Sequence, residues 1–138
     1  EKDKTIEKLN SKISLLKVSE LIAASKIHGE TKIICSYLKN TDASSLSLIC
    51  DMVKDKLDDF ILALACSDDQ KGNIAVAVGQ KTLKKGAHAG KIVKAIAALA
   101  DGNGGGKPDR AMAGVKNINK LADAISQSES IILKHLNN

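Results

Sequence analysis

The chain has 138 residues and carries 21 Lys and Arg against 16 Asp and Glu, which gives it a net charge of +5. This length suits one domain with a core of its own. The longest apolar stretch, residues 92–100, is too short to cross a membrane and contains Lys94. Its only aromatic residues are Tyr37 and Phe60, which excludes a base-stacking platform of the kind that single-strand binding proteins use. Because position 1 is Glu1, we expect a piece of a longer protein.

The charge is divided unevenly between the two halves of the chain. Residues 1–70 carry ten Lys and twelve Asp or Glu, a net charge of −2, whereas residues 71–138 carry ten Lys and one Arg against four Asp or Glu, a net charge of +7. A basic half suits a polyanionic partner such as an RNA backbone, and a solvated lysine-rich surface accounts for it equally well.

Cysteine and histidine spacing argues against a metal site. The three cysteines lack the CxxC spacing of zinc sites, and no histidine pairs with another His or Cys at the spacing of metal ligands. We therefore expect reduced thiols, a cytoplasmic location and no cofactor in this chain. The residues concerned are Cys35, Cys50, Cys66, His28, His88 and His135.

The first predicted element is a long amphipathic helix over residues 1–28, which Gly29 ends. We accordingly divide the chain into a helical arm, residues 1–29, and a globular domain, residues 30–138. The helix carries two apolar stripes, and such a helix requires a partner. Self-association through residues 1–28 is therefore expected.

Strands and helices alternate through the rest of the chain. Apolar and β-branched runs predict strands over 31–38, 60–67 and 73–79, and the turn residues 68–72 join the last two into a hairpin. Helical periodicity predicts helices over 42–57, 88–100 and 117–136, and residues 110–113 suit a short strand. The predicted fold class is α+β: an N-terminal long helix followed by a mixed β-sheet domain flanked by helices, in the order α-β-α-β-β-α-β-α.

A glycine-rich run between two of these elements is the candidate functional site. Four glycines occupy five positions of 102–106, and Lys107, the only proline and the only arginine follow. We expect a loop, because Gly and Pro disfavour helix and strand interiors. Its bare peptide N–H groups would approach an anion closely. No catalytic residue is assigned; the candidate nucleic-acid-binding residues are Gly104, Gly105, Gly106, Lys107, Arg110, Lys84, Lys85 and Lys91. The alternative is a loop that only connects a helix to a strand.

Three blocks resemble a known family. Residues 102–114, GNGGGKPDRAMAG, resemble the GGGRPDMAQAGG-type segment near the C-terminus of alanyl-tRNA synthetases. That segment lies in the DHH-associated (DHHA) domain that these enzymes share with certain phosphoesterases. Residues 73–79, NIAVAVG, resemble the family's ALIAGVS strand, and residues 88–93, HAGKIV, its KAGELV helix start. The chain departs from the pattern at Lys107, Arg110 and Met112, where the family shows Arg, Met and Gln.

The resemblance implies the C-terminal tRNA-binding domain of an alanine–tRNA ligase, which binds the outer corner of tRNA and supports aminoacylation and editing. It implies no catalysis by this chain alone, since ATP, magnesium and zinc would be used by other domains of the parent enzyme. No membrane partner is expected. Two alternatives stay open: the substrate-binding half of a DHH-type phosphoesterase, and an oligomerisation module. In those phosphoesterases a histidine follows the glycine-rich loop and holds the substrate's phosphate; Lys107 stands in its place here.

Overall fold

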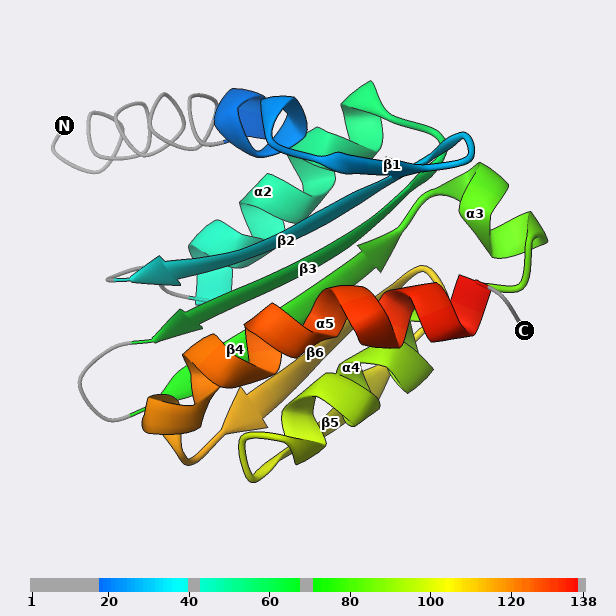
Figure 1. Ribbon diagram of the computed structural model, residues 1–138. Coiled ribbons are helices and arrows are strands. Elements are labelled where there is room, and N and C mark those ends of the chain that lie inside the picture. Colours follow the sequence, from blue (N-terminus) through cyan, green and yellow to red (C-terminus); the bar gives the residue numbers. More distant parts are fainter. Residues whose placement is uncertain (1–17, 40–42, 68–70, 137–138) are drawn as a thin grey trace, which may run out of the picture.

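The computed structural model describes residues 18–39, 43–67 and 71–136, which form a six-stranded mixed sheet with helices on both faces (Figure 1). The strand order is β1-β2-β3-β4-β6-β5. Helix α2 covers one face, and α4 and α5 lie side by side on the other. The predicted α+β class is confirmed. Of the predicted N-terminal helix, residues 18–23 are helical and residues 1–17 lie outside the described part of the chain.

The elements follow one another without a repeat. They are β1 (Lys26–His28), β2 (Thr31–Lys39), α2 (Ala43–Lys56), β3 (Phe60–Ser67), β4 (Gly72–Val78), α3 (Gln80–Lys84), α4 (Ala89–Ala98), β5 (Gly102–Gly106), β6 (Arg110–Val115), a 3-10 turn (Ile118–Lys120) and α5 (Leu121–Leu136). Strands β2 and β3 run parallel, joined by the crossover helix α2, and the other neighbouring strands run antiparallel. The predicted hairpin of β3 and β4 is present.

The centre of the sheet is buried on both faces. All eight residues of β3 are buried. Its side chains alternate between the two layers, so that Ile61 and Ala63 pack with α4 and α5, whereas Leu62 and Leu64 pack with α2. A strand covered on both faces needs apolar residues at successive positions. This requirement explains why the run FILALACS was recognisable from the sequence.

The predicted helix over residues 1–28 is wrong at its C-terminal end. Residues 26–28 form β1, which pairs with β2 in register from Lys26 with Ile33 to His28 with Thr31. Gly29, at φ +66°, occupies the tight turn between these strands and does not end the helix. Helical periodicity runs on through Ile27, but that side chain is 68% exposed, so strand pairing and not burial decides its conformation. Upstream, Val18 is fully buried in the layer beneath α2.

The expected glycine-rich loop is also wrong, because residues 102–106 form the edge strand β5. Its even-numbered glycines lie against the backbone of β6. A Cβ atom at Gly102 would stand 2.6 Å from the Gly114 carbonyl oxygen, and one at Gly106 would stand 2.8 Å from the Ala111 Cα; at Gly104 the collision with Ala113 would be closer still. The glycines therefore permit a close strand approach, which composition alone does not reveal.

Candidate nucleic-acid interface

The predicted site residues begin at the turn between β5 and β6. The Lys107 amide donates to the Arg110 carbonyl oxygen at 2.9 Å, which closes the turn, and the Ala89 amide donates to the Pro108 carbonyl oxygen at 2.7 Å. The second bond ties the turn to the first residue of α4. His88 caps that helix, with its Nδ1 accepting a bond from the Lys91 amide at 3.3 Å. The fold thus brings Lys107 close to the beginning of α4, from which Lys91 projects.

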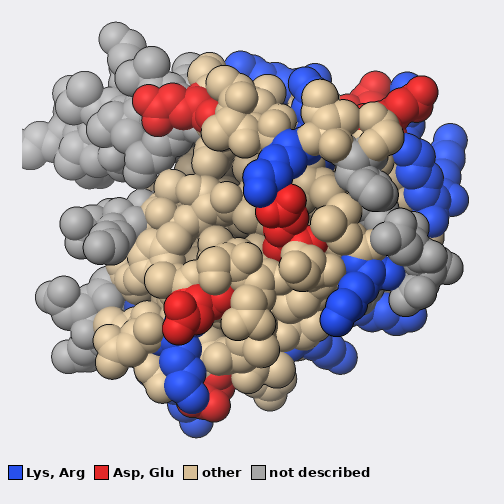
Figure 2. All heavy atoms as spheres, viewed as in Figure 1, with Lys and Arg blue, Asp and Glu red and all other residues tan. Residues whose placement is uncertain are grey.

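Three of the predicted lysines form no ion pair within the described part of the chain. Lys84 ends α3, Lys91 lies in the first turn of α4, and Lys107 lies in the β5–β6 turn; all three are exposed. No described carboxylate forms an ion pair with them. Figure 2 shows that lysine and arginine side chains gather along the side of the molecule where α3 lies in Figure 1. These cations are available to a phosphate backbone.

Lys85 is instead held by a polar cluster at the base of α3. Its Nζ lies 2.6 Å from Asp59 Oδ2 and 3.2 Å from Thr31 Oγ1. Asp59 also accepts bonds from the hydroxyls of Thr31 and Thr82, at 2.7 and 2.9 Å. Burial raises the pKa of Asp59, but the bonds from Lys85, Thr31 and Thr82 outweigh it and leave that pKa below its ordinary value. Lys85 therefore serves first to anchor α3.

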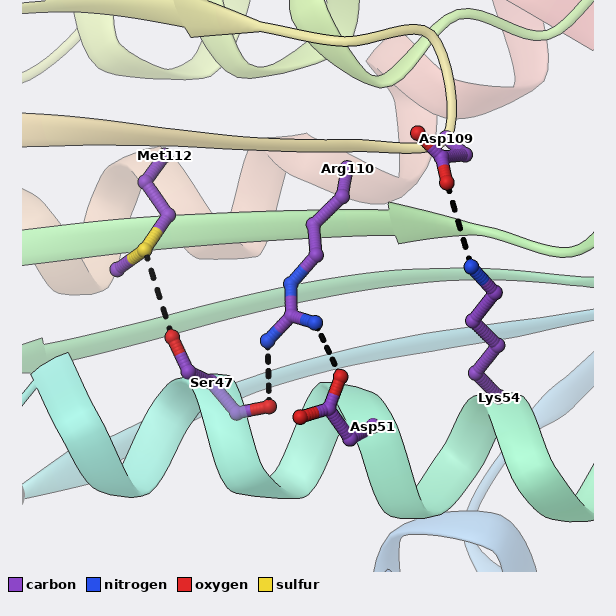
Figure 3. Close-up of polar contacts among 6 residues, drawn as sticks. All are labelled: Ser47, Asp51, Lys54, Asp109, Arg110 and Met112. Atoms are coloured by element: carbon purple, nitrogen blue, oxygen red, sulfur yellow. Dashed lines mark hydrogen bonds and ion pairs between the residues drawn. The ribbon is translucent and has the colours of Figure 1, made fainter.

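Arg110 points to the opposite face of the sheet, onto α2 (Figure 3). Its guanidinium forms an ion pair with Asp51 and donates to the Ser47 carbonyl oxygen at 2.5 Å. Ser47 and Asp51 lie one helical turn apart, so both face β6. The structure therefore separates Arg110 from the cations of α3 and α4 and gives its charge a partner.

Two further contacts continue this line between α2 and β6. The Ser47 hydroxyl donates to the sulfur of Met112 at 3.8 Å, and Lys54 Nζ lies 3.2 Å from Asp109 Oδ2 (Figure 3). The bond from Lys54 lowers the pKa of Asp109. Two of the three positions at which the chain departs from the family's string, Arg110 and Met112, thus face α2.

The three predicted glycines differ in what a Cβ atom added to each would meet. Gly104 and Gly106 face β6, as described above. Gly105 faces outward, where the nearest atom to an added Cβ is Lys94 Cε at 3.1 Å. Lys94 therefore extends along the outer edge of β5, and the sequence analysis missed it. Its position three residues after Lys91 on α4, hence on the same helical face, was the signal that could have found it.

The described residues hold no group of three or more His, Cys, Asp or Glu side chains placed to bind a metal ion. The three cysteines are free thiols, and burial raises the pKa of Cys50 to about 11, which keeps that thiol protonated and unreactive at neutral pH. None of the described helices is long and apolar enough to span a membrane.

Comparisons with known proteins identify the fold and the family. Residues 30–134 match the model of the DHHA1 domain. The chain is 40% identical over 135 residues to the alanine–tRNA ligase of Natranaerobius thermophilus and 32% identical over 137 residues to that of Alkaliphilus oremlandii. These alignments cover 98% and 99% of the chain but only 15% and 16% of the relatives' own lengths.

A solved structure shows the same architecture. The C-Ala domain of Aquifex aeolicus alanyl-tRNA synthetase superposes with a TM-score of 0.69 at 19% identity, over 78% of this chain and 96% of that one. The family match covers the five strands β2 to β6, the helices α2 to α4 and α5 up to residue 134, and leaves out the edge strand β1. The chain therefore belongs to the DHHA1 domain family.

Proposed function

We propose that this chain is the C-terminal tRNA-binding domain of an alanine–tRNA ligase, and that it binds the outer corner of tRNA. The main support for this proposal is a set of exposed lysines on adjoining segments with no ion-pair partner among the described residues. These lysines are Lys84, Lys91, Lys94 and Lys107. The similarity to alanine–tRNA ligases over 98% of the chain supports the choice of RNA.

The binding mode follows from what this surface offers. Lysines neutralise phosphates as point charges, and phosphate contacts position a protein without reading sequence. Because the chain has only two aromatic residues, base stacking contributes little. The domain should bind different tRNA species with similar affinity. Discrimination in favour of alanine tRNA would then belong to other parts of the parent enzyme.

In the parent, this domain would hold one tRNA for both aminoacylation and editing. ATP, magnesium and zinc would serve other domains of that ligase, and this chain would bind no cofactor. A cytoplasmic location and self-association through residues 1–28 belong to the same proposal.

A salt series tests the proposal directly. Each phosphate contact should lower the logarithm of the affinity by about 0.7–0.9 for each tenfold rise in salt. Lys107→Ala should weaken tRNA binding about fivefold and remove about one contact from the slope. The matched control is Lys26→Ala, which removes the same charge at the opposite sheet edge, where it pairs with Glu129. A flat salt response, or equal binding by both variants, would reject the proposed surface.

The phosphoesterase alternative makes a different prediction. The chain as it stands should not hydrolyse oligonucleotides or phosphodiesters, with or without manganese, because its described residues assemble no cluster of metal ligands. Turnover that persists through further purification, and that Lys107→Ala abolishes, would replace the tRNA-binding proposal with a hydrolytic one.

A further inference from the structure

A groove of about 660 Å³ opens at the end of β5 that lies away from the Lys107 turn. It forms where β4 and β5 begin and β6 ends. The residues that matter for the argument are Lys71, Asn73, Asp101, Asn103, Gly114 and Lys116. None of the four lysines of the proposed tRNA-binding surface lines this groove.

Strand register places two carboxamides on either side of a glycine. Asn73 of β4 and Asn103 of β5 both pair with Gly114 of β6. Paired residues on neighbouring strands share a face, so the two asparagines flank Gly114 at a separation of about 10 Å, twice the spacing between strands. A Cβ at Gly114 would meet nothing within 4 Å, so the floor between the asparagines is open.

Three polar side chains of the groove, those of Asn73, Asn103 and Lys116, are available to a ligand. Neither carboxamide forms a hydrogen bond with another side chain of the described residues, and Lys116 has no ion pair there. The one carboxylate at the rim, Asp101, is paired with Lys120 at 3.5 Å. The groove therefore presents amide donors and acceptors beside uncompensated positive charge.

We propose that this groove holds one unstacked nucleotide of the bound tRNA, with its base between Asn73 and Asn103 above Gly114. The inference rests on the proposed function. A carboxamide places a donor and an acceptor side by side, which matches the hydrogen-bonding edge of a base. Proteins recognise RNA mainly at unstacked loop bases of this kind. Lys116 supplies the cation for the adjoining phosphate.

The position of the groove agrees with the path of the lysines. Strand β5 has five residues, which span about 16 Å. The Lys107 turn lies at one end of this edge, the groove lies at the other, and Lys94 lies beside Gly105 between them. Gly114 and its asparagines share the face of β6 that carries Arg110 and Met112, so one folded RNA would meet all three by wrapping around this edge.

Gly114→Val tests the proposal by filling the floor of the groove. Valine suits a strand and its Cβ meets open space, so thermal stability should be preserved. We expect tRNA affinity to fall about tenfold, the cost of losing one well-placed base contact. Affinity for a fully paired RNA duplex, which offers no unstacked base, should not change. Asn103→Ala should reduce tRNA affinity about threefold, whereas Gln127→Ala, which removes an exposed carboxamide from α5, should not.

The possible results separate failure of the groove proposal from failure of the tRNA-binding proposal. If Gly114→Val binds tRNA as the unaltered chain does, the groove proposal fails and the lysine surface stands. Equal losses for tRNA and duplex would also overturn it, because no unstacked base would be involved. Should the unaltered chain fail to bind tRNA at all, both proposals fall. If Gly114→Val does not fold, Asn103→Ala carries the same comparison between tRNA and duplex.

Discussion

Side chains added at adjacent glycines of β5 would meet different neighbours. An alanine methyl at Gly104 would collide with the backbone of β6, and the two strands would have to separate. At Gly105 the nearest obstacle is the end of the Lys94 side chain, which can turn away. We expect Gly104→Ala to lower the free energy of unfolding by about 2 kcal/mol and Gly105→Ala to change it by less than about 0.5 kcal/mol. Urea denaturation of both variants measures this difference; equal stabilities would show that β5 does not pack on β6 in this way.

Asp59 makes the stability of the fold depend on pH. Its pKa in the folded chain lies below the ordinary value of 3.8, so its contribution is fully present above that value and is lost as the pH falls through the folded pKa. Asp59→Ala would also leave the buried hydroxyls of Thr31 and Thr82 without their acceptor, at a cost of about 1–3 kcal/mol.

Denaturation of Asp59→Ala and Asp59→Asn between pH 7 and pH 3 separates the two effects. Asparagine keeps one acceptor for a hydroxyl and removes the titrating charge. It should therefore be the more stable of the two variants at pH 7, and both should lack the part of the acid loss that Asp59 causes, while the part from Asp109 remains. An unchanged pH profile in Asp59→Asn would contradict this role for Asp59.

Among the elements, α2 and β6 are joined by contacts that lie on the face opposite α4. Arg110 forms the central contact, with Asp51 and the Ser47 carbonyl oxygen. Arg110→Met keeps much of the packing and loses both polar contacts, so stability should fall by about 1 kcal/mol. Its loss of tRNA affinity should be smaller than that of Lys107→Ala, because Asp51 already compensates the charge. Thermal melts and tRNA titrations on both variants would show opposite orders; the same order in both measurements would return Arg110 to the RNA surface.

The elements that sequence reasoning predicted are those that carry a burial pattern. Strand β3 was predicted at its observed limits, because a strand covered on both faces requires apolar residues at successive positions of the sequence. Strand β5 has only one side chain beyond glycine, that of Asn103, which cannot form a pattern, and its glycines were taken for a loop. Strand β1 has three residues, and its pairing with β2 depends on tertiary contacts that no local window contains.

The candidate site was only partly predictable for the same reason. Lys84, Lys91 and Lys107, which the sequence named as candidates for nucleic-acid binding, are exposed in the structure. The sequence could not show which cations find carboxylates, since Asp59 and Asp51 reach Lys85 and Arg110 across 26 and 59 positions. Sequence reasoning also missed the groove, because register alone brings Asn73 and Asn103 to either side of Gly114.

The N-terminal segment should contribute differently to folding and to association. Val18 is fully buried beside α2, and β1 adds an edge strand to the sheet. A chain that begins at residue 18 keeps both, whereas one that begins at residue 29 loses both. We expect the shorter chain to be less stable by about 3 kcal/mol or more, because a buried cluster is opened and strand pairing is lost. The chain that begins at residue 18 should melt within a few degrees of the unaltered protein.

Light scattering on the same two chains tests the proposed self-association. If residues 1–17 carry it, the chain that begins at residue 18 should be folded and monomeric, with a smaller mass per particle than the full chain at equal concentration. If that chain still associates, the contact lies elsewhere, and Ile27, an exposed apolar side chain on the edge strand β1, becomes the position to change next. Ile27→Lys would then reduce the mass to that of a monomer without lowering the melting temperature, since the side chain packs against little in the described structure.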